Sequence, residues 1–106
     1  REPITLYAFA PHMHLRGKSI RVEALSASDD DTKQCLLDVP RWDFHHQEGY
    51  WLDKGVRVSK AAVTCRWDNR ASAQPIRSGK RSPSRELRWG EGTDDEMCLA
   101  FLYATL

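Results

Sequence analysis

The sequence predicts an all-β domain, an antiparallel, jelly-roll-like β-sandwich. Apolar side chains alternate with their neighbours along residues 4–9 and 20–25, which is the two-residue period of a strand. No stretch carries the 3.6-residue apolar stripe of a capped helix, and short strands at this spacing favour antiparallel sheets that bury one face. Gly, Pro and an Asp-rich turn at residues 29–31 separate further expected strands over residues 34–39, 44–52, 56–67 and 97–105.

Length and charge restrict the classes of partner. The 106 residues correspond to one domain, and a chain of this size buries only about two-thirds of the surface that it exposes when unfolded. Sixteen Lys and Arg against fifteen Asp and Glu give a net charge of +1, so no global field attracts nucleic acid or an anionic membrane. The apolar runs are far shorter than the roughly 20 residues that span a bilayer. We therefore expect no nucleic-acid partner and no membrane partner.

Both ends of the sequence indicate a longer protein. The chain begins at Arg1 rather than Met, and it ends at Leu106 inside an apolar run that starts at Cys98 and predicts a strand still in progress. We expect residues 1–106 to be one domain of a longer chain, incomplete at the N-terminal end.

Residues 68–84 predict a loop rich in Ser, Pro, Gly and Arg, here called the flap loop. It is longer than compact domains usually tolerate without function or disorder. Its cations could bind a phosphate or a carboxylate, but no aromatic residue interleaves them before Trp89, so a solvated loop is favoured. The cations of the loop and its exit are Arg70, Arg77, Lys80, Arg81, Arg85 and Arg88.

The three cysteines, Cys35, Cys65 and Cys98, allow three choices of disulfide pair in an oxidising compartment. Three buried, reduced thiols in a cytosolic domain are equally compatible with the composition.

A candidate metal site starts from His12 and His14. A period of two places both imidazoles on one face of a strand, where they can share a metal ion. Met97 is a candidate third ligand, because a soft thioether favours Cu(I) over ions that prefer carboxylate. The alternatives are a chance His-x-His on an exposed strand and a methionine that fills the core.

Two motifs occur together in order, H-M-H-L-R-G-K at residues 12–18 and T-D-D-E-M-C at residues 93–98. They resemble the C-terminal copper domain of the peptidylglycine and dopamine β-monooxygenases. The segments P-R-W-D-F-H-H-Q-E at residues 40–48 and T-C-R-W-D-N at residues 64–69 extend the resemblance over nearly the whole chain. The resemblance implies that His12, His14 and Met97 bind the single copper ion at which dioxygen is activated.

The resemblance also implies a disulfide between Cys65 and Cys98, which would fix the neighbour of Met97 and stabilise a small domain by a few kcal/mol. Cys35 is then free, or bridged to a segment outside this sequence. A disulfide places the protein in the periplasm or outside the cell.

His45 and His46 occupy successive positions of an expected strand, so they point to opposite faces and at most one faces the copper. The family's copper takes two His and one Met. We therefore expect both to be structural, with His45 able to support the ligands from outside the coordination sphere.

The sequence departs from the peptide-amidating members at the positions that bind the substrate carboxylate. These positions are Ala10, Leu99 and Phe101, and none can bind a carboxylate in that way. The period of two would place Leu99 and Phe101 on one strand face with Met97, as an apolar wall beside the copper. The alternative is that this face is simply core. The motifs are closer to bacterial relatives than to the animal enzymes.

The resemblance therefore implies a copper-dependent monooxygenase domain that hydroxylates a C–H bond of a small organic substrate. Electrons would come from an ascorbate-type reductant through a second copper domain elsewhere in the full-length chain, so this domain alone would not turn over. Two other classes stay open: a non-catalytic copper module for carriage or sensing, and a purely structural sandwich.

Overall fold

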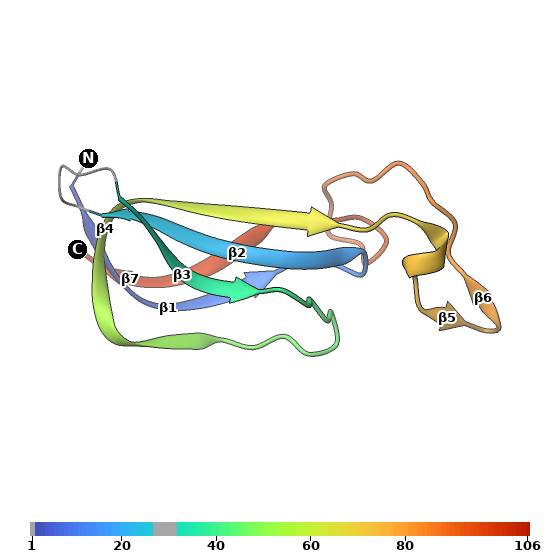
Figure 1. Ribbon diagram of the computed structural model, residues 1–106, viewed down its shortest axis with the longest axis horizontal. Coiled ribbons are helices and arrows are strands. Elements are labelled where there is room, and N and C mark those ends of the chain that lie inside the picture. The colour runs from blue at the N-terminus through green and yellow to red at the C-terminus, as the bar shows by residue number, and fades with distance from the viewer. Residues whose placement is uncertain (1, 27–31) are drawn as a thin grey trace.

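The computed structural model describes residues 2–26 and 32–106, and its dimensions are 52 × 22 × 22 Å. The all-β, antiparallel prediction is confirmed, and the arrangement is consistent with a β-sandwich. One sheet has the strand order β3-β2-β4-β1-β7 (Figure 1). Its strands are β1 (Ile4–His12), β2 (Gly17–Ser26), β3 (Lys33–Val39), β4 (Tyr50–Trp67) and β7 (Leu99–Thr105). The Asp-rich turn predicted at residues 29–31 lies outside the described residues.

The core of this sheet is built by the predicted alternation. Leu6, Phe9, Val22, Ala24 and Val58 are each at most 2 % exposed and form one cluster. They come from β1, β2 and β4, the three central strands, and partly buried side chains of β3 and β7 pack around them. The edge strands β3 and β7 therefore contribute less to the core than β1, β2 and β4, each of which is paired with a strand on both sides.

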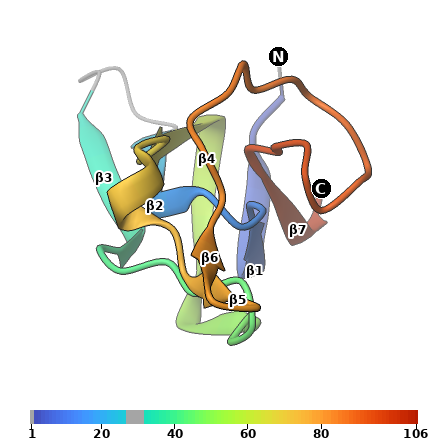
Figure 2. The same cartoon turned by 90° about the vertical axis from the view of Figure 1, so that its right-hand side faces the viewer.

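The flap loop contains regular structure that the sequence pattern does not predict. A 3₁₀ turn, η1 (Ala71–Ala73), precedes a hairpin of β5 (Ile76–Arg77) and β6 (Lys80–Arg81). Ser78 and Gly79 connect the two strands with φ angles of 49° and 74°, the left-handed geometry of a tight hairpin turn. The hairpin lies beyond one end of the five-stranded sheet (Figure 1), and Figure 2 views the molecule from that end.

An ion pair fixes the start of the flap loop. Arg70 donates to the Asp68 carboxylate from Nε at 2.9 Å and from Nη2 at 2.6 Å. These side-chain hydrogen bonds are the main reason that the pKa of Asp68 falls from 3.8 to about 2. Because the folded-state pKa is the lower one, the stabilisation from this pair is present above about pH 3.8 and is lost as the pH falls toward 2.

The strand predicted over residues 44–52 is partly wrong. It begins only at Tyr50 and continues through residues 56–67 as the single strand β4. The cause is Asp43, whose side chain accepts a hydrogen bond from the backbone N–H of His45 at 2.9 Å while its carbonyl accepts one from His46 at 3.0 Å. Such local bonds form a turn in place of a ladder. His45 and His46 therefore do not occupy opposite faces of a strand.

Strand β4 bends where it follows β1, and Gly55 permits the bend. The register with β1 shifts between Leu6 and Ala8, which pair with Val56 and Trp51. A Cβ at position 55 would lie 2.6 Å from Thr5 and 2.7 Å from Tyr7, so a larger residue would force these side chains apart.

No helix in the described part of the chain is long and apolar enough to cross a membrane.

A disulfide joins the end of β4 to the approach to β7. Cys65 and Cys98 are bonded at 2.08 Å, as the family resemblance implies, and they are 33 residues apart in sequence. Cys35 is free and exposed on the edge strand β3. The bond therefore closes a loop that contains the whole flap loop.

Removing this disulfide should lower the free energy of unfolding by about 4 kcal/mol, because cross-linking a loop of this length restricts the unfolded chain. We expect this loss in a Cys65→Ala, Cys98→Ala double variant, measured by urea denaturation. Cys35→Ser is the control and should leave the midpoint unchanged. Equal effects of the two changes would contradict the assignment of Cys65–Cys98 as a stabilising cross-link.

Candidate metal centre

His12 and His14 lie close together at the end of β1. Their ring centroids are 5.1 Å apart and their planes meet at 85°. Strand β1 ends at His12, so the two-residue strand period does not extend to His14. Instead His14 begins a turn in which its carbonyl accepts a hydrogen bond from the Gly17 N–H at 3.2 Å. His14 is buried, with 4 % exposure, whereas His12 is half-buried.

A glutamine fixes the tautomer of His12. Its Nδ1 lies 2.7 Å from Oε1 of Gln47, and the Gln47 amide is oriented because its Nε2 donates to the Phe44 carbonyl at 2.8 Å. The Gln47 oxygen can only accept, so Nδ1 of His12 carries the proton and donates it. In the neutral form of the ring, the other nitrogen, Nε2, then holds the lone pair.

A backbone carbonyl fixes the tautomer of His14 in the same way. Nδ1 of His14 lies 2.9 Å from the Asp95 carbonyl oxygen, which is again only an acceptor. Nδ1 thus donates, and Nε2 carries the lone pair. An imidazole that donates from one nitrogen to a fixed acceptor is oriented for metal binding through the other.

Contacts to both histidines flank Met97 in sequence. The two preceding residues bind His14: the Asp95 carbonyl accepts from its ring, and the Glu96 carboxylate accepts from its backbone N–H at 3.1 Å. Two residues after Met97, Leu99 pairs with His12 across β1 and β7. Met97 is half-buried and precedes β7, so the predicted strand over residues 97–105 starts two residues later than expected. The period argument that grouped Met97 with Leu99 and Phe101 therefore does not apply.

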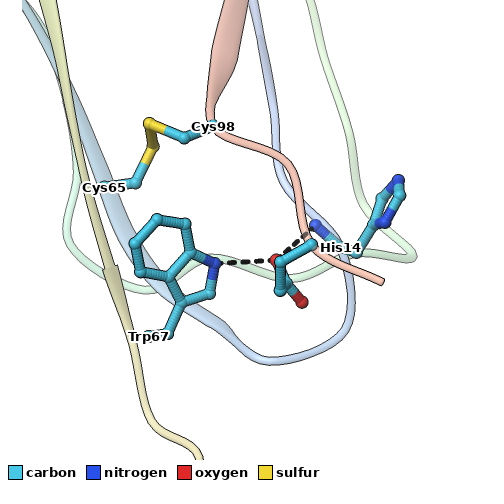
Figure 3. The surroundings of a disulfide bond; sticks show 5 residues. His14, Cys65, Trp67 and Cys98 are labelled. Atoms are coloured by element: carbon cyan, nitrogen blue, oxygen red, sulfur yellow. Dashed lines mark hydrogen bonds between the residues drawn. A yellow bond between two sulfur atoms is a disulfide. The ribbon is translucent and has the colours of Figure 1, made fainter. Parts of the chain in front are cut away.

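Glu96 is a buried carboxylate, 5 % exposed, that organises the loop carrying His14. It accepts hydrogen bonds from the backbone N–H of His14 at 3.1 Å, from that of Arg16 at 2.9 Å and from the indole of Trp67 at 2.7 Å. The bonds from Trp67 and His14 meet at the same oxygen, Oε1 of Glu96, and Figure 3 shows these two residues beside the Cys65–Cys98 disulfide. One side chain thus connects the histidine turn, the end of β4 and the segment before β7.

Trp42 also binds the histidine turn. Its indole Nε1 donates to the His14 carbonyl at 3.1 Å, and its ring packs where Gly17 leaves room. A Cβ at position 17 would lie 2.6 Å from Cδ1 of Trp42 and 3.0 Å from the buried Met13. The glycine of the H-M-H-L-R-G-K motif is therefore required for this packing.

The other predicted site residues lie around this centre in different ways. His45 and His46 are exposed, and His46 Nε2 lies 3.0 Å from the Glu48 carboxylate. His45 reaches His14 only indirectly, because the ring of Phe44 contacts both. On β1 and β7 the expected wall residues Ala10 and Phe101 are paired, and the Phe101 ring lies 6.5 Å from that of His12.

Sequence reasoning missed Gln47, Glu96 and the Asp95 carbonyl. The rule that a metal-bound histidine needs a hydrogen-bond acceptor on its second nitrogen predicts that such partners exist. Nothing in the local pattern identifies them, because Gln47 is 35 residues from His12 and Glu96 is 82 residues from His14.

The chemistry of the candidate ligands can be compared with the preferences of metal ions. Across residues 2–26 and 32–106, no three His, Cys, Asp or Glu side chains gather into a group that could hold a metal ion. If Met97 joined His12 and His14 at one ion, the donor set of two imidazoles and one thioether would suit Cu(I) and would be poorly suited to Mg²⁺ or Ca²⁺. The residues present therefore fit a copper ion.

Comparison with protein families gives a match over residues 1–104 to the family described as copper type II ascorbate-dependent monooxygenase, C-terminal domain. The chain therefore belongs to this family, as its motifs indicate. Comparisons with curated proteins and with solved structures find no match.

Replacing Glu96 by Gln should lower the free energy of unfolding by about 1–3 kcal/mol, because the amide nitrogen would face N–H groups that the carboxylate accepts from. Glu91→Gln, at an exposed position near the same loop, is the matched control and should change stability by less than about 0.5 kcal/mol. Both are measured by urea denaturation. If Glu96→Gln is as stable as the control, the carboxylate does not hold the loop.

Proposed function

We propose that this chain binds one copper ion through Nε2 of His12, Nε2 of His14 and the thioether of Met97, as the oxygen-activating domain of a monooxygenase. The observation that carries the proposal is the pair of Nδ1 hydrogen bonds, to Gln47 and to the Asp95 carbonyl. These bonds leave the Nε2 lone pair of each ring available to coordinate a metal ion. Membership of the copper-dependent family supports the same conclusion.

The ligand residues would perform different tasks. His14 is buried and hydrogen-bonded through ring and backbone, so it would provide a rigid donor. His12 is held by a side chain of the exposed loop before β4, so its ring would be the more adjustable donor. Met97 would supply a soft thioether, which favours Cu(I), the state that reacts with dioxygen. Bound copper would supply dioxygen activation for insertion of an oxygen atom into a substrate C–H bond.

The surroundings of His12 support an apolar substrate. A hollow of about 220 Å³ next to the β1–β7 pair is lined by Ala10, Phe101 and other mainly apolar residues. Phe101 is 64 % exposed, so its ring is not buried in the core and can contact a ligand. The alternative, that this face is simply core, is less consistent with that exposure. We propose a small, uncharged organic substrate that approaches along this wall.

The proposal includes partners that this domain does not supply. An ascorbate-type reductant would deliver electrons through a second copper domain elsewhere in the full-length chain. The Cys65–Cys98 bond supports an oxidising compartment, the periplasm or the outside of the cell.

Cu(I) titration tests the ligand set. We expect one ion per chain and a loss of affinity of more than about 100-fold in His14→Ala and in Met97→Ala, exceeding the 10- to 100-fold effect of losing an outer partner. His46→Ala removes an exposed imidazole outside the centre and is the matched control. X-ray absorption should detect a sulfur scatterer at thioether distance in the wild type. Equal affinity in all variants, or no sulfur scatterer, would refute the assignment.

The substrate class is tested with the two-domain protein, ascorbate and paired substrates. We expect turnover of neutral aromatic amines or hydrocarbons and poor turnover of glycine-extended peptides. A carboxylate forms charge-assisted hydrogen bonds worth about 1.5–3 kcal/mol each in a matching site, and Ala10, Leu99 and Phe101 offer none. Efficient hydroxylation of a glycine-extended peptide would contradict the apolar-wall proposal while leaving the copper assignment intact.

A further inference from the structure

Arg16 is a buried cation whose side chain binds only neutral groups. It is 6 % exposed. Its Nη1 donates to the backbone carbonyl and to the side-chain oxygen of Asn69, at 3.3 Å and 2.7 Å, and its Nη2 donates to the Pro83 carbonyl at 2.8 Å. Within residues 2–26 and 32–106, no carboxylate forms an ion pair with this guanidinium. A buried charge is normally paired, because an unpaired one carries a large desolvation penalty.

Two further arginines line a cavity that Arg16 also borders. The cavity measures about 30 Å³ and includes Arg77 of β5, Arg85 at the exit of the flap loop, and the hydroxyl-bearing residues Ser82 and Thr93. Asp94 is the one carboxylate in its lining, and it lies 3.6 Å from Arg85. Arg16 and Arg77 are therefore left without a carboxylate of their own in the described part of the chain.

The lining and the size define the class of ligand. Guanidinium and hydroxyl groups present N–H and O–H donors, which are suited to an anion. About 10–15 Å³ is enough for one water molecule, so the cavity admits a particle of one or two water volumes. A monoatomic halide fits within this volume, whereas a tetrahedral oxyanion such as sulfate would have to extend out of it toward solvent.

We propose that this cavity is a binding site for a single chloride-sized inorganic anion between Arg16, Arg77 and Arg85. The anion would compensate the buried charge of Arg16. It would also connect the turn after His14 to two neighbouring parts of the chain that are distant from that turn in sequence, the β5–β6 hairpin and the exit of the flap loop. The flap loop would then be fixed against the histidine turn by an ion as well as by the Asn69 and Pro83 hydrogen bonds. The proposal does not depend on copper.

Thermal unfolding of the metal-free protein tests the site, with sodium chloride compared with sodium gluconate at one ionic strength. Gluconate is too large for the cavity. We expect chloride to raise the midpoint temperature of unfolding until the site is saturated. At a chloride concentration of one hundred times Kd, the equilibrium constant for folding should rise about 100-fold. Arg77→Gln removes a charge from an exposed position and should abolish the chloride-dependent rise without unfolding the protein. Arg88→Gln, an exposed arginine paired with Glu86 outside the cavity lining, is the matched control and should retain it.

Separate measurements test the position of the anion and the size selectivity of the site. Crystals grown in sodium bromide should show an anomalous peak between Arg16 and Arg77. The proposal is overturned by a wild-type midpoint that is independent of chloride, by an unchanged chloride response in Arg77→Gln, or by equal stabilisation with sulfate. A bromide peak without chloride-dependent stabilisation would indicate an adventitious ion only and would also overturn it.

Discussion

The local structure around His14 in the candidate metal centre depends on the buried carboxylate of Glu96. A carboxylate has several acceptor positions and no donor, so it can bind N–H groups that approach from different chain segments. Glu96 binds three, from the backbone of His14 and Arg16 and from the indole of Trp67. Without these bonds, the two backbone N–H groups of the histidine turn would be buried with no partner. Such a loss typically carries a penalty of about 1–3 kcal/mol per group.

The position of Glu96 in the sequence makes this carboxylate decisive for the site. Asp95, immediately before it, accepts from the His14 ring, and Met97, immediately after it, is the candidate thioether ligand. Cys98 is tied to β4 by the disulfide. Four consecutive residues therefore have four separate roles, and a shift of one residue in this segment would displace all of them. The sheet is small and its core is modest. Directional hydrogen bonds and one covalent disulfide nevertheless hold this segment in place.

The sequence predicted most of the sheet but little of the local geometry around the histidines. Alternation identifies the strands of the core because burial of one face imposes a period of two on the side chains. It fails at residues 44–49, where Asp43 binds the backbone of its successors and forms a turn. It fails again at His14 and Met97, which lie just outside their expected strands. The disulfide pair followed from family resemblance, since composition left three choices. The acceptors that fix the histidine tautomers are tertiary contacts, which no local pattern contains.

The burial of the centre is asymmetric, and this asymmetry restricts how any ligand reaches it. On the His14 side, the Trp42 indole and the Glu96 carboxylate bind the backbone of His14, and the ring of Phe44 packs edge-on against its imidazole. On the His12 side, the neighbouring ring is Phe101, which is largely exposed and borders an apolar hollow. Access through the His14 side would break the hydrogen bonds that the His14 backbone forms with Glu96 and Trp42, whereas access beside His12 breaks neither. The buried histidine, His14, therefore faces the protein, and the half-buried one, His12, faces the β1–β7 surface. The same division explains why His12 depends on a side chain from an exposed loop, Gln47, while His14 depends on the main chain.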